Sequence, residues 1–449
     1  MVFSSFTFLL LFMPLVLLGS IYIPKKGRML FLLAASLFFY GWGSPLWLIL
    51  LVGSMLVNYG GTRLMMRGGK RRRAVFVILI ILNLLPLLWY KYAGFFRDNL
   101  EALTGWRIRF DNPVLPAGIS FFTFQAMSYV IDVWRGKARV QRSLPVFGVY
   151  LSLFPQLVAG PIVRYVDLEE QLLSGRKPTW EEIREGLGRF SIGLAKKVLL
   201  ADAFGRFWGQ MNGQFTAAGA LGAWLGLLAF SFQIYFDFSG YSDMALGLGK
   251  AMGFSLPENF DNPYRASSLT EFWRRWHITL TVWFREYVYI PLGGNRVSRI
   301  RRDLNVLIVW ALTGFWHGAG WNYVIWGLYF ALLLILEKRF IAENKPFGKL
   351  PEWVRRGLTF LTVLIGWGIF SGFAGSLLPA MTGAYGWGTP DTLLTCAAFS
   401  PLLILSAILC FRGKTDGGKL PRFAAPILFV LCLAALAAQG YAPFVYFQF

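Results

Sequence analysis

The amino-acid sequence predicts an all-α protein that crosses a membrane many times, and three observations support this fold class. Hydrophobic residues make up 56% of the 449 residues and charged residues only 15%, against roughly 25% charged in soluble domains. Apolar runs recur from end to end, many of them approaching the ~20 residues that a spanning helix needs. The runs are continuous rather than alternating, which disfavours a transmembrane barrel.

Basic residues lie mainly between the apolar runs, although the net charge is +21. This pattern is typical of the positive-inside rule, so we predict a lipid bilayer and no nucleic acid as partner. The segment Arg63–Arg73 has six basic residues and no acidic one, and we expect it in the cytoplasm. No basic residue precedes the first apolar run, which predicts an uncleaved first helix with its N-terminus outside.

The early elements follow from apolar runs and from helix breakers. Residues 29–61 are interrupted by Gly41–Pro45, so we expect a hairpin of two helices there. Two further crossings are expected at residues 74–96 and 117–134. Residues 145–162 contain Pro155 and Pro161, which predicts kinks or a re-entrant shape.

The later elements include one amphipathic segment. Residues 178–205 carry basic side chains, Lys196 and Lys197 among them, and are expected to form an interfacial helix. The apolar segment 219–256 contains four polar side chains that either make interhelical hydrogen bonds or line a cavity: Asp237, Ser239, Tyr241 and Asp243. With the remaining runs the charge pattern gives roughly ten or eleven membrane helices. We expect one integral domain over residues 1–449.

Both histidines of the chain, His277 and His317, lie in the stretch 258–327. A neutral imidazole can remove the proton of an attacking hydroxyl. His317 lies between two apolar runs, and a titratable group at membrane depth is a functional candidate. The glycines around it let a backbone or a ligand approach closely. Neither a GxSxG turn nor a Ser-His-Asp order is present, and the three cysteines show no metal-ligand spacing, so no metal site is predicted.

The segment 268–290 is expected to form one helix that carries His277. Eight arginines stand against two glutamates between Arg265 and Arg302. Arginine forks suit phosphate, so this face either docks a phosphate-bearing donor such as coenzyme A or anchors an interfacial helix. Composition alone favours the anchor. The residues assigned to donor binding are Arg274, Arg285, Trp273, Trp276 and Thr281.

Several motifs, in a fixed order along the chain, resemble those of a known family. They include ENF..PY, TEFWRRWHITL, REYVYIPLGGNR and GFWHGA.WNY.IWG, together with the opening MVFSS, LPAGISFFTFQAMSYVIDVWRG, FPQLVAGPIVR, YFDFSGYSDMALGLG and the closing YFQF. The chain resembles the membrane-bound O-acyltransferase (MBOAT) family. It is most similar to the bacterial branch of alginate and peptidoglycan O-acetyltransferase membrane components.

The resemblance implies an arched ring of helices around a thin floor, with a central tunnel linking a cytoplasmic donor to an outside acceptor. His317 matches the catalytic histidine and His277 the second motif position. Asn322, in the WNY motif, is assigned to the tunnel lining with the four polar residues named above. The implied donor substrate is acetyl-CoA, with no bound cofactor. The implied partners are a periplasmic SGNH hydrolase-like protein and a polysaccharide acceptor, at the bacterial inner membrane.

Three alternatives stay open at this point. A D-alanine transfer protein, which takes its acyl group from a carrier protein, would share the histidines. A lipid or protein acyltransferase would use a long-chain acyl donor. A non-catalytic transporter or scaffold would tolerate replacement of either histidine.

Overall fold

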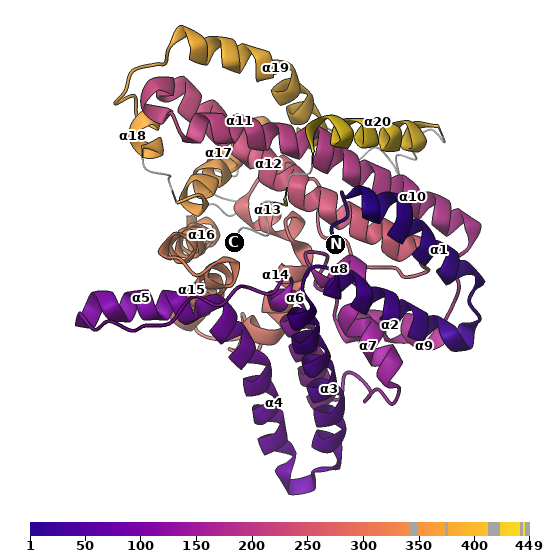
Figure 1. The fold of residues 1–449 in the computed structure, drawn as a ribbon. Coiled ribbons are helices and arrows are strands. Elements are labelled where there is room, and N and C mark those ends of the chain that lie inside the picture. The colour runs from indigo at the N-terminus through magenta and orange to yellow at the C-terminus, as the bar shows by residue number, and fades with distance from the viewer. Residues whose placement is uncertain (341–348, 373–375, 412–422, 441–442, 445–449) are drawn as a thin grey trace. The chain divides into compact units, whose positions relative to one another are not determined.

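The computed structural model describes residues 1–340, 349–372, 376–411, 423–440 and 443–444. All regular structure in these ranges is helical, which confirms the all-α prediction (Figure 1). The closing YFQF motif and the basic stretch Arg412–Arg422 lie outside the described residues.

The chain forms two compact units, the first from residues 1–192 and 241–258 and the second from 193–240 and 259–449. The long helix α12 (Phe215–Ala251) supplies residues to both. The expectation of one integral domain stays a prediction.

The first unit holds the N-terminal helices. They are η1 (Thr7–Phe12), α1 (Met13–Tyr22), α2 (Lys25–Gly41), α3 (Pro45–Arg67), η2 (Gly69–Arg71), α4 (Arg72–Leu87), η3 (Leu88–Tyr92), α5 (Ala93–Thr104), α6 (Ile119–Trp134), α7 (Leu144–Ser152), α8 (Phe154–Leu157), α9 (Tyr165–Ser174) and most of α10 (Trp180–Ala195).

The second unit holds the later helices. They are η4 (Lys196–Ala201), α11 (Asp202–Asn212), most of α12, η5 (Pro263–Arg265), α13 (Leu269–Arg275), α14 (Ile278–Phe284), η6 (Arg285–Tyr289), α15 (Arg299–His317), α16 (Trp321–Phe340), α17 (Glu352–Phe370), α18 (Leu377–Met381), α19 (Pro390–Phe411) and α20 (Ala424–Gln439).

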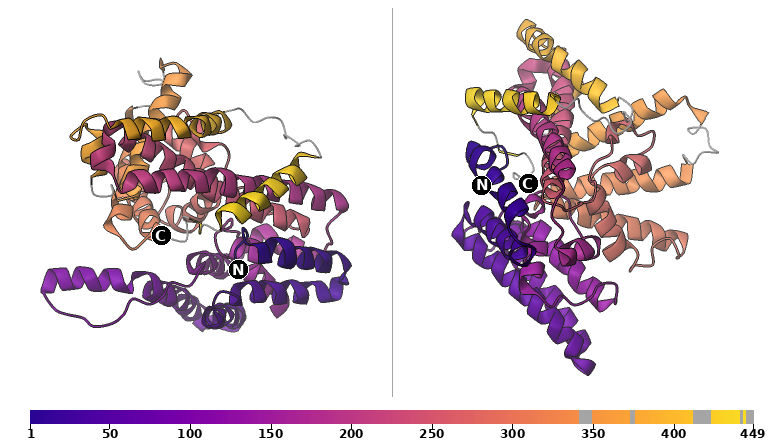
Figure 2. Two further views of the ribbon diagram at one scale, coloured as in Figure 1. Left: turned by 45° about the horizontal axis from the view of Figure 1, so that its top comes forward. Right: turned by 90° about the vertical axis from the view of Figure 1, so that its right-hand side faces the viewer.

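Local sequence explains the breaks in the first unit. The predicted hairpin is confirmed, because α2 ends at Gly41 and α3 begins at Pro45, where a proline lacks only an N–H that the helix start leaves unpaired anyway. The predicted kink also occurs, between α7 and α8. Pro155 lies in the first turn of α8. Helices α3 and α4 run side by side (Figures 1 and 2). Reciprocal amide hydrogen bonds join Asn58 and Asn83 across them, at 2.9 and 2.8 Å.

The predicted interfacial helix 178–205 consists of α10, the π-helical turn η4 and the start of α11. Helix α10 begins with a capping box, in which the Glu182 N–H donates to Thr179 Oγ1 at 3.2 Å and the Thr179 N–H donates to Glu182 Oε2 at 2.8 Å. Lys197 does not lie on a polar surface as expected. It is buried, with its Nζ 2.6 Å from Asp202 Oδ1 and 2.8 Å from Asp237 Oδ1.

Two glycines bring α15 and α16 into backbone contact in the second unit. A Cβ built on Gly314 would lie 2.1 Å from the Tyr323 carbonyl oxygen, and one built on Gly327 would lie 2.2 Å from the Trp310 carbonyl oxygen. Small residues allow this close packing of membrane helices. The contact fixes the end of α15, where His317 stands, against α16.

Four helical runs among the described residues are long and apolar enough to cross a membrane by length and composition. They are Pro45–Arg67, Gly69–Thr104, Phe215–Ala251 and Pro390–Phe411. The expected total of ten or eleven membrane helices stays a prediction, as do the ring and the tunnel.

Candidate active site

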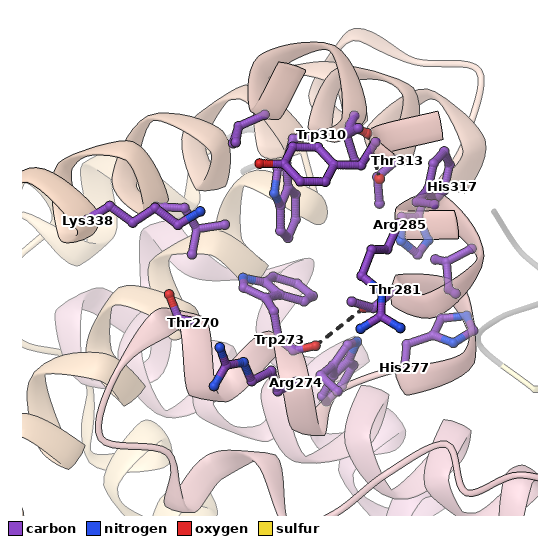
Figure 3. A pocket seen from close by; sticks show the side chains of 17 residues that line it. Thr270, Trp273, Arg274, His277, Thr281, Arg285, Trp310, Thr313, His317 and Lys338 are labelled. Carbon is purple, nitrogen blue, oxygen red and sulfur yellow. Dashed lines mark hydrogen bonds between the residues drawn. The ribbon is translucent and has the colours of Figure 1, made fainter. Parts of the chain in front are cut away.

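A cavity of about 250 Å³ in the second unit brings both histidines together (Figure 3). Elements α13, α14, η6, α15 and α16 form its wall. The lining residues are Thr270, Trp273, Arg274, Trp276, His277, Leu280, Thr281, Phe284, Arg285, Tyr289, Val306, Val309, Trp310, Thr313, His317, Leu334 and Lys338.

His317 is the last residue of α15 and is buried. Aromatic rings stand edge-on to its imidazole, with ring centroids 5.0 Å away for Trp316, 5.1 Å for Trp326 and 5.4 Å for Phe370. These rings surround the imidazole with apolar surface. The neighbouring glycine serves packing rather than a ligand, since a Cβ on Gly318 would meet the Tyr323 ring.

The expectation of one helix over residues 268–290 is wrong. Helix α13 ends at Arg275 and α14 begins at Ile278, and His277 between them is left-handed, with φ 43° and ψ 55°. This conformation costs a residue with a side chain roughly 1–2 kcal/mol. Backbone pairing with residues 259–261 holds the break open. The Asp261 N–H donates to the Arg275 carbonyl, and the Ile278 N–H donates to the Asn259 carbonyl, both at 3.0 Å.

The His277 side chain is buried beside an amide that sequence reasoning missed. Its Nδ1 lies 3.1 Å from Asn259 Oδ1, and the Phe238 ring stands edge-on at 4.7 Å between centroids. The Trp316 ring neighbours both histidines, at 5.9 Å from His277 and 5.0 Å from His317. Asn259 stands in the same motif-rich stretch as His277, and this closeness in sequence is the signal that could have identified it.

All the residues assigned to donor binding line this cavity: Arg274, Arg285, Trp273, Trp276 and Thr281. The Thr281 hydroxyl donates to the Trp273 carbonyl at 3.3 Å, which ties α14 to α13 across the break. Their role in binding a donor stays a prediction.

Lys338 is a further cation in the lining that the sequence analysis did not select. It stands in the last turn of α16. Its charge is repelled by Arg302 and Arg274 and attracted by Asp303 and Glu337. Among the described residues neither Arg274 nor Lys338 has an ion-pair partner, whereas Arg285 lies 3.3 Å from Glu286. Figure 3 shows Lys338 on the side of the cavity opposite the two histidines. The sequence signal that could have identified Lys338 is the basic pair Lys338 and Arg339 at the end of the apolar run of α16.

The residues assigned to a tunnel lining are absent from the lining of this cavity. Asp237 is paired with Lys197, and Ser239 is buried in the same unit. Tyr241 and Asp243 belong to the first unit, where Tyr241 stacks on Phe3 at 4.7 Å between centroids and Asp243 Oδ1 lies 2.9 Å from Arg189 Nη2.

The last member of that set, Asn322, stands in the first turn of α16. Its side-chain amide donates to the Phe370 carbonyl at 2.8 Å. That contact joins α16 to α17 beside one of the rings around His317. A tunnel role for any of the five stays a prediction.

Comparison with known proteins identifies the family. The profile of the membrane-bound O-acyltransferase family matches residues 117–356. A probable alginate O-acetylase AlgI of Pseudomonas syringae is 36% identical, with 100% of both chains covered. The peptidoglycan O-acetyltransferase of Helicobacter pylori is 34% identical over 82% of this chain and 77% of its own. The teichoic acid D-alanyltransferase of Streptococcus thermophilus is 30% identical over 58% of this chain and 69% of its own. The matching profile, the full-length similarity and the paired histidines show that this chain belongs to the membrane-bound O-acyltransferase family.

Proposed function

We propose that this protein is a membrane O-acetyltransferase that passes acetyl groups from cytoplasmic acetyl-CoA across the bacterial inner membrane for O-acetylation of an extracytoplasmic polysaccharide. The observation that carries the proposal is a cavity that has two buried histidines on one side and, on the other, Lys338, which has no ion-pair partner among the described residues. The alginate and peptidoglycan enzymes among its relatives support an acetyl group and a polysaccharide acceptor.

His317 is proposed as the proton acceptor. As the hydroxyl oxygen attacks the thioester carbonyl, its proton passes to the neutral imidazole. The carbon–sulfur bond then breaks, and the proton goes to the departing thiolate of coenzyme A. The aromatic rings around His317 keep water away, which limits hydrolysis of the thioester.

The cations of the cavity are proposed to hold the phosphates of the donor. Arg274 and Lys338 have no carboxylate within ion-pair distance in the described part of the chain, so both cations are available to a phosphate. The indoles of Trp273 and Trp276 also line the cavity and give it apolar wall. This arrangement suits a donor that is anionic at one end and carries its acyl group at the other.

The attacking hydroxyl is proposed to reach the cavity through a central tunnel from a periplasmic SGNH hydrolase-like partner, which then carries the acetyl ester and completes transfer to the polysaccharide. The N-terminus would then lie outside and Arg63–Arg73 in the cytoplasm, following the charge asymmetry. D-alanyl transfer is less supported, because that relative covers a smaller share of the chain. A long-chain lipid or protein acyltransferase has no specific observation in its favour, and a non-catalytic scaffold does not fit an O-acyltransferase family.

The test is transfer of labelled acetyl from acetyl-CoA to partner or glycan, in membranes with matched amounts of each variant. His317→Ala and His317→Gln should both lose the ~10²–10⁴-fold contribution of a general base. His277→Ala should lose less, since its role is supporting. Tyr289→Phe, which changes another lining residue, is the control. Near-normal transfer by both His317 variants would refute the assignment, and an acetyl-imidazole trapped on His317 would make it a nucleophile.

A further inference from the structure

Asn259 makes more contacts to the break around His277 than any packing role needs. Its carbonyl accepts the Ile278 N–H at 3.0 Å. Its side-chain Oδ1 lies 3.1 Å from His277 Nδ1, 3.3 Å from the Thr279 backbone nitrogen and 3.0 Å from Thr279 Oγ1. The residue is fully buried, so these contacts define its orientation without competition from solvent.

The Thr279 backbone fixes which end of the Asn259 amide faces His277. An amide group can be turned over with little change in shape, so its oxygen and nitrogen must be assigned from partners. A backbone N–H can only donate a hydrogen bond. The atom that faces the Thr279 nitrogen must therefore be the amide oxygen, and the same atom faces His277 Nδ1.

An amide oxygen can only accept, so His277 Nδ1 must carry a hydrogen. A neutral imidazole has one protonated nitrogen and one with a free lone pair. The neutral form is favoured because the ring is buried against Phe238 and Trp316. The other nitrogen, Nε2, is buried and has no hydrogen-bond partner among the described residues.

We infer that Asn259 is a positioning residue that holds His277 in the tautomer protonated on Nδ1, so that Nε2 keeps its lone pair beside the cavity that His277 lines. In this state His277 accepts a hydrogen bond from a hydroxyl, thiol or amide of the bound substrate. It does not donate one to the thioester carbonyl. The identity of that substrate rests on the proposed function, whereas the tautomer does not.

The two histidines make the tautomer directly measurable. Full-length protein labelled with ¹⁵N-histidine and purified in detergent gives signals from only two imidazoles, and the His317→Gln variant assigns the remaining one to His277. The ¹⁵N shifts should show Nδ1 protonated and Nε2 unprotonated. A wild-type His277 protonated on Nε2 would overturn the inference, whatever the variants do.

Substitutions then test the role of Asn259. Asn259→Leu removes the acceptor at similar volume and should abolish the tautomer preference. Asn259→Asp keeps an acceptor at the same place and should retain it. Thr279→Val removes only the hydroxyl that shares Oδ1, and it should leave the spectrum unchanged. An unchanged His277 spectrum in Asn259→Leu would show that another group sets the tautomer.

Activity provides the second measurement. Groups that orient a metal-bound histidine typically change activity by about 10–100-fold when they are removed, and we expect kcat for acetyl transfer to fall by a comparable factor in Asn259→Leu. Asn259→Asp should recover much of the loss, which a merely structural role would not explain. Absence of acetyl transfer in the wild type, with the expected spectrum, would refute the proposed function and leave the tautomer assignment standing.

Discussion

Arg274 and Lys338 give the proposed donor site its sharpest quantitative test. Both line the cavity, and in the described chain neither has a carboxylate within ion-pair distance. Arg274→Gln and Lys338→Met remove each charge at similar length. The expected result is weaker use of acetyl-CoA with little change in folding, because no ion pair is broken.

The size of the effect follows from the contact that is lost. A hydrogen bond to a charged group is worth about 1.5–3 kcal/mol, and about 1.4 kcal/mol is tenfold in affinity. Each variant should therefore raise KM for acetyl-CoA by about 10- to 150-fold. The phosphates lie far along the donor from the reacting carbonyl, so kcat should change little.

The assay is the initial rate of acetyl transfer against acetyl-CoA concentration in inverted membrane vesicles, at two salt concentrations. Salt should weaken donor use by the wild type more than by the variants, because it screens charge. Arg299→Gln, which changes an exposed arginine outside the cavity, is the matched control. An unchanged KM in both variants, or an equal rise in the control, would leave membrane anchoring as the role of this basic face.

Two further predictions concern topology and acid stability. Ala384 and Lys70 are both exposed. In a chain whose native cysteines are replaced, an impermeant maleimide added outside intact cells should label Ala384→Cys and not Lys70→Cys. The reverse labelling pattern would contradict the proposed orientation. The hydrogen bonds from Arg176 hold the pKa of the Glu182 carboxyl at about 2, below its ordinary 4.5. Its stabilisation is therefore present above pH 4.5 and lost as pH falls toward 2. Glu182→Gln should lower thermal stability at pH 7 more than at pH 3, by no more than ~1 kcal/mol because the pair is partly exposed. A loss of the same size at both pH values would contradict this reasoning.

Local signals in the sequence were enough to predict some helix ends. The break between α2 and α3 falls at Gly41–Pro45, where the chain itself disfavours a helix. The break at His277 has no such signal, since the surrounding segment contains neither glycine nor proline. It depends on hydrogen bonds to Asn259 and Asp261, which the fold brings to it.

In the candidate site, too, residues close together in sequence were predicted, and a residue that helix packing brings in was not. Trp273, Arg274 and Thr281 were predicted together because they are close in sequence to His277, and they do line one cavity. Lys338 reaches that cavity from α16, through helix packing that no local pattern encodes. Lys197 was expected on a polar surface for a related reason. Its ion-pair partner Asp237 belongs to α12, and the sequence around Lys197 gives no sign of that contact.

The backbone contacts of Gly314 and Gly327 restrict how the donor preference of this enzyme can diverge. At both glycines a carbonyl oxygen of the facing helix occupies the place of a side chain, so no larger residue fits without moving the helix that ends in His317. Leu280, Val306 and Leu334 line the cavity through their side chains, and aliphatic residues of similar volume can replace one another at modest cost. If the donor binds as proposed, selection for a different acyl group can act on aliphatic lining residues near the histidines, such as Leu280, while the two glycines keep His317 in place.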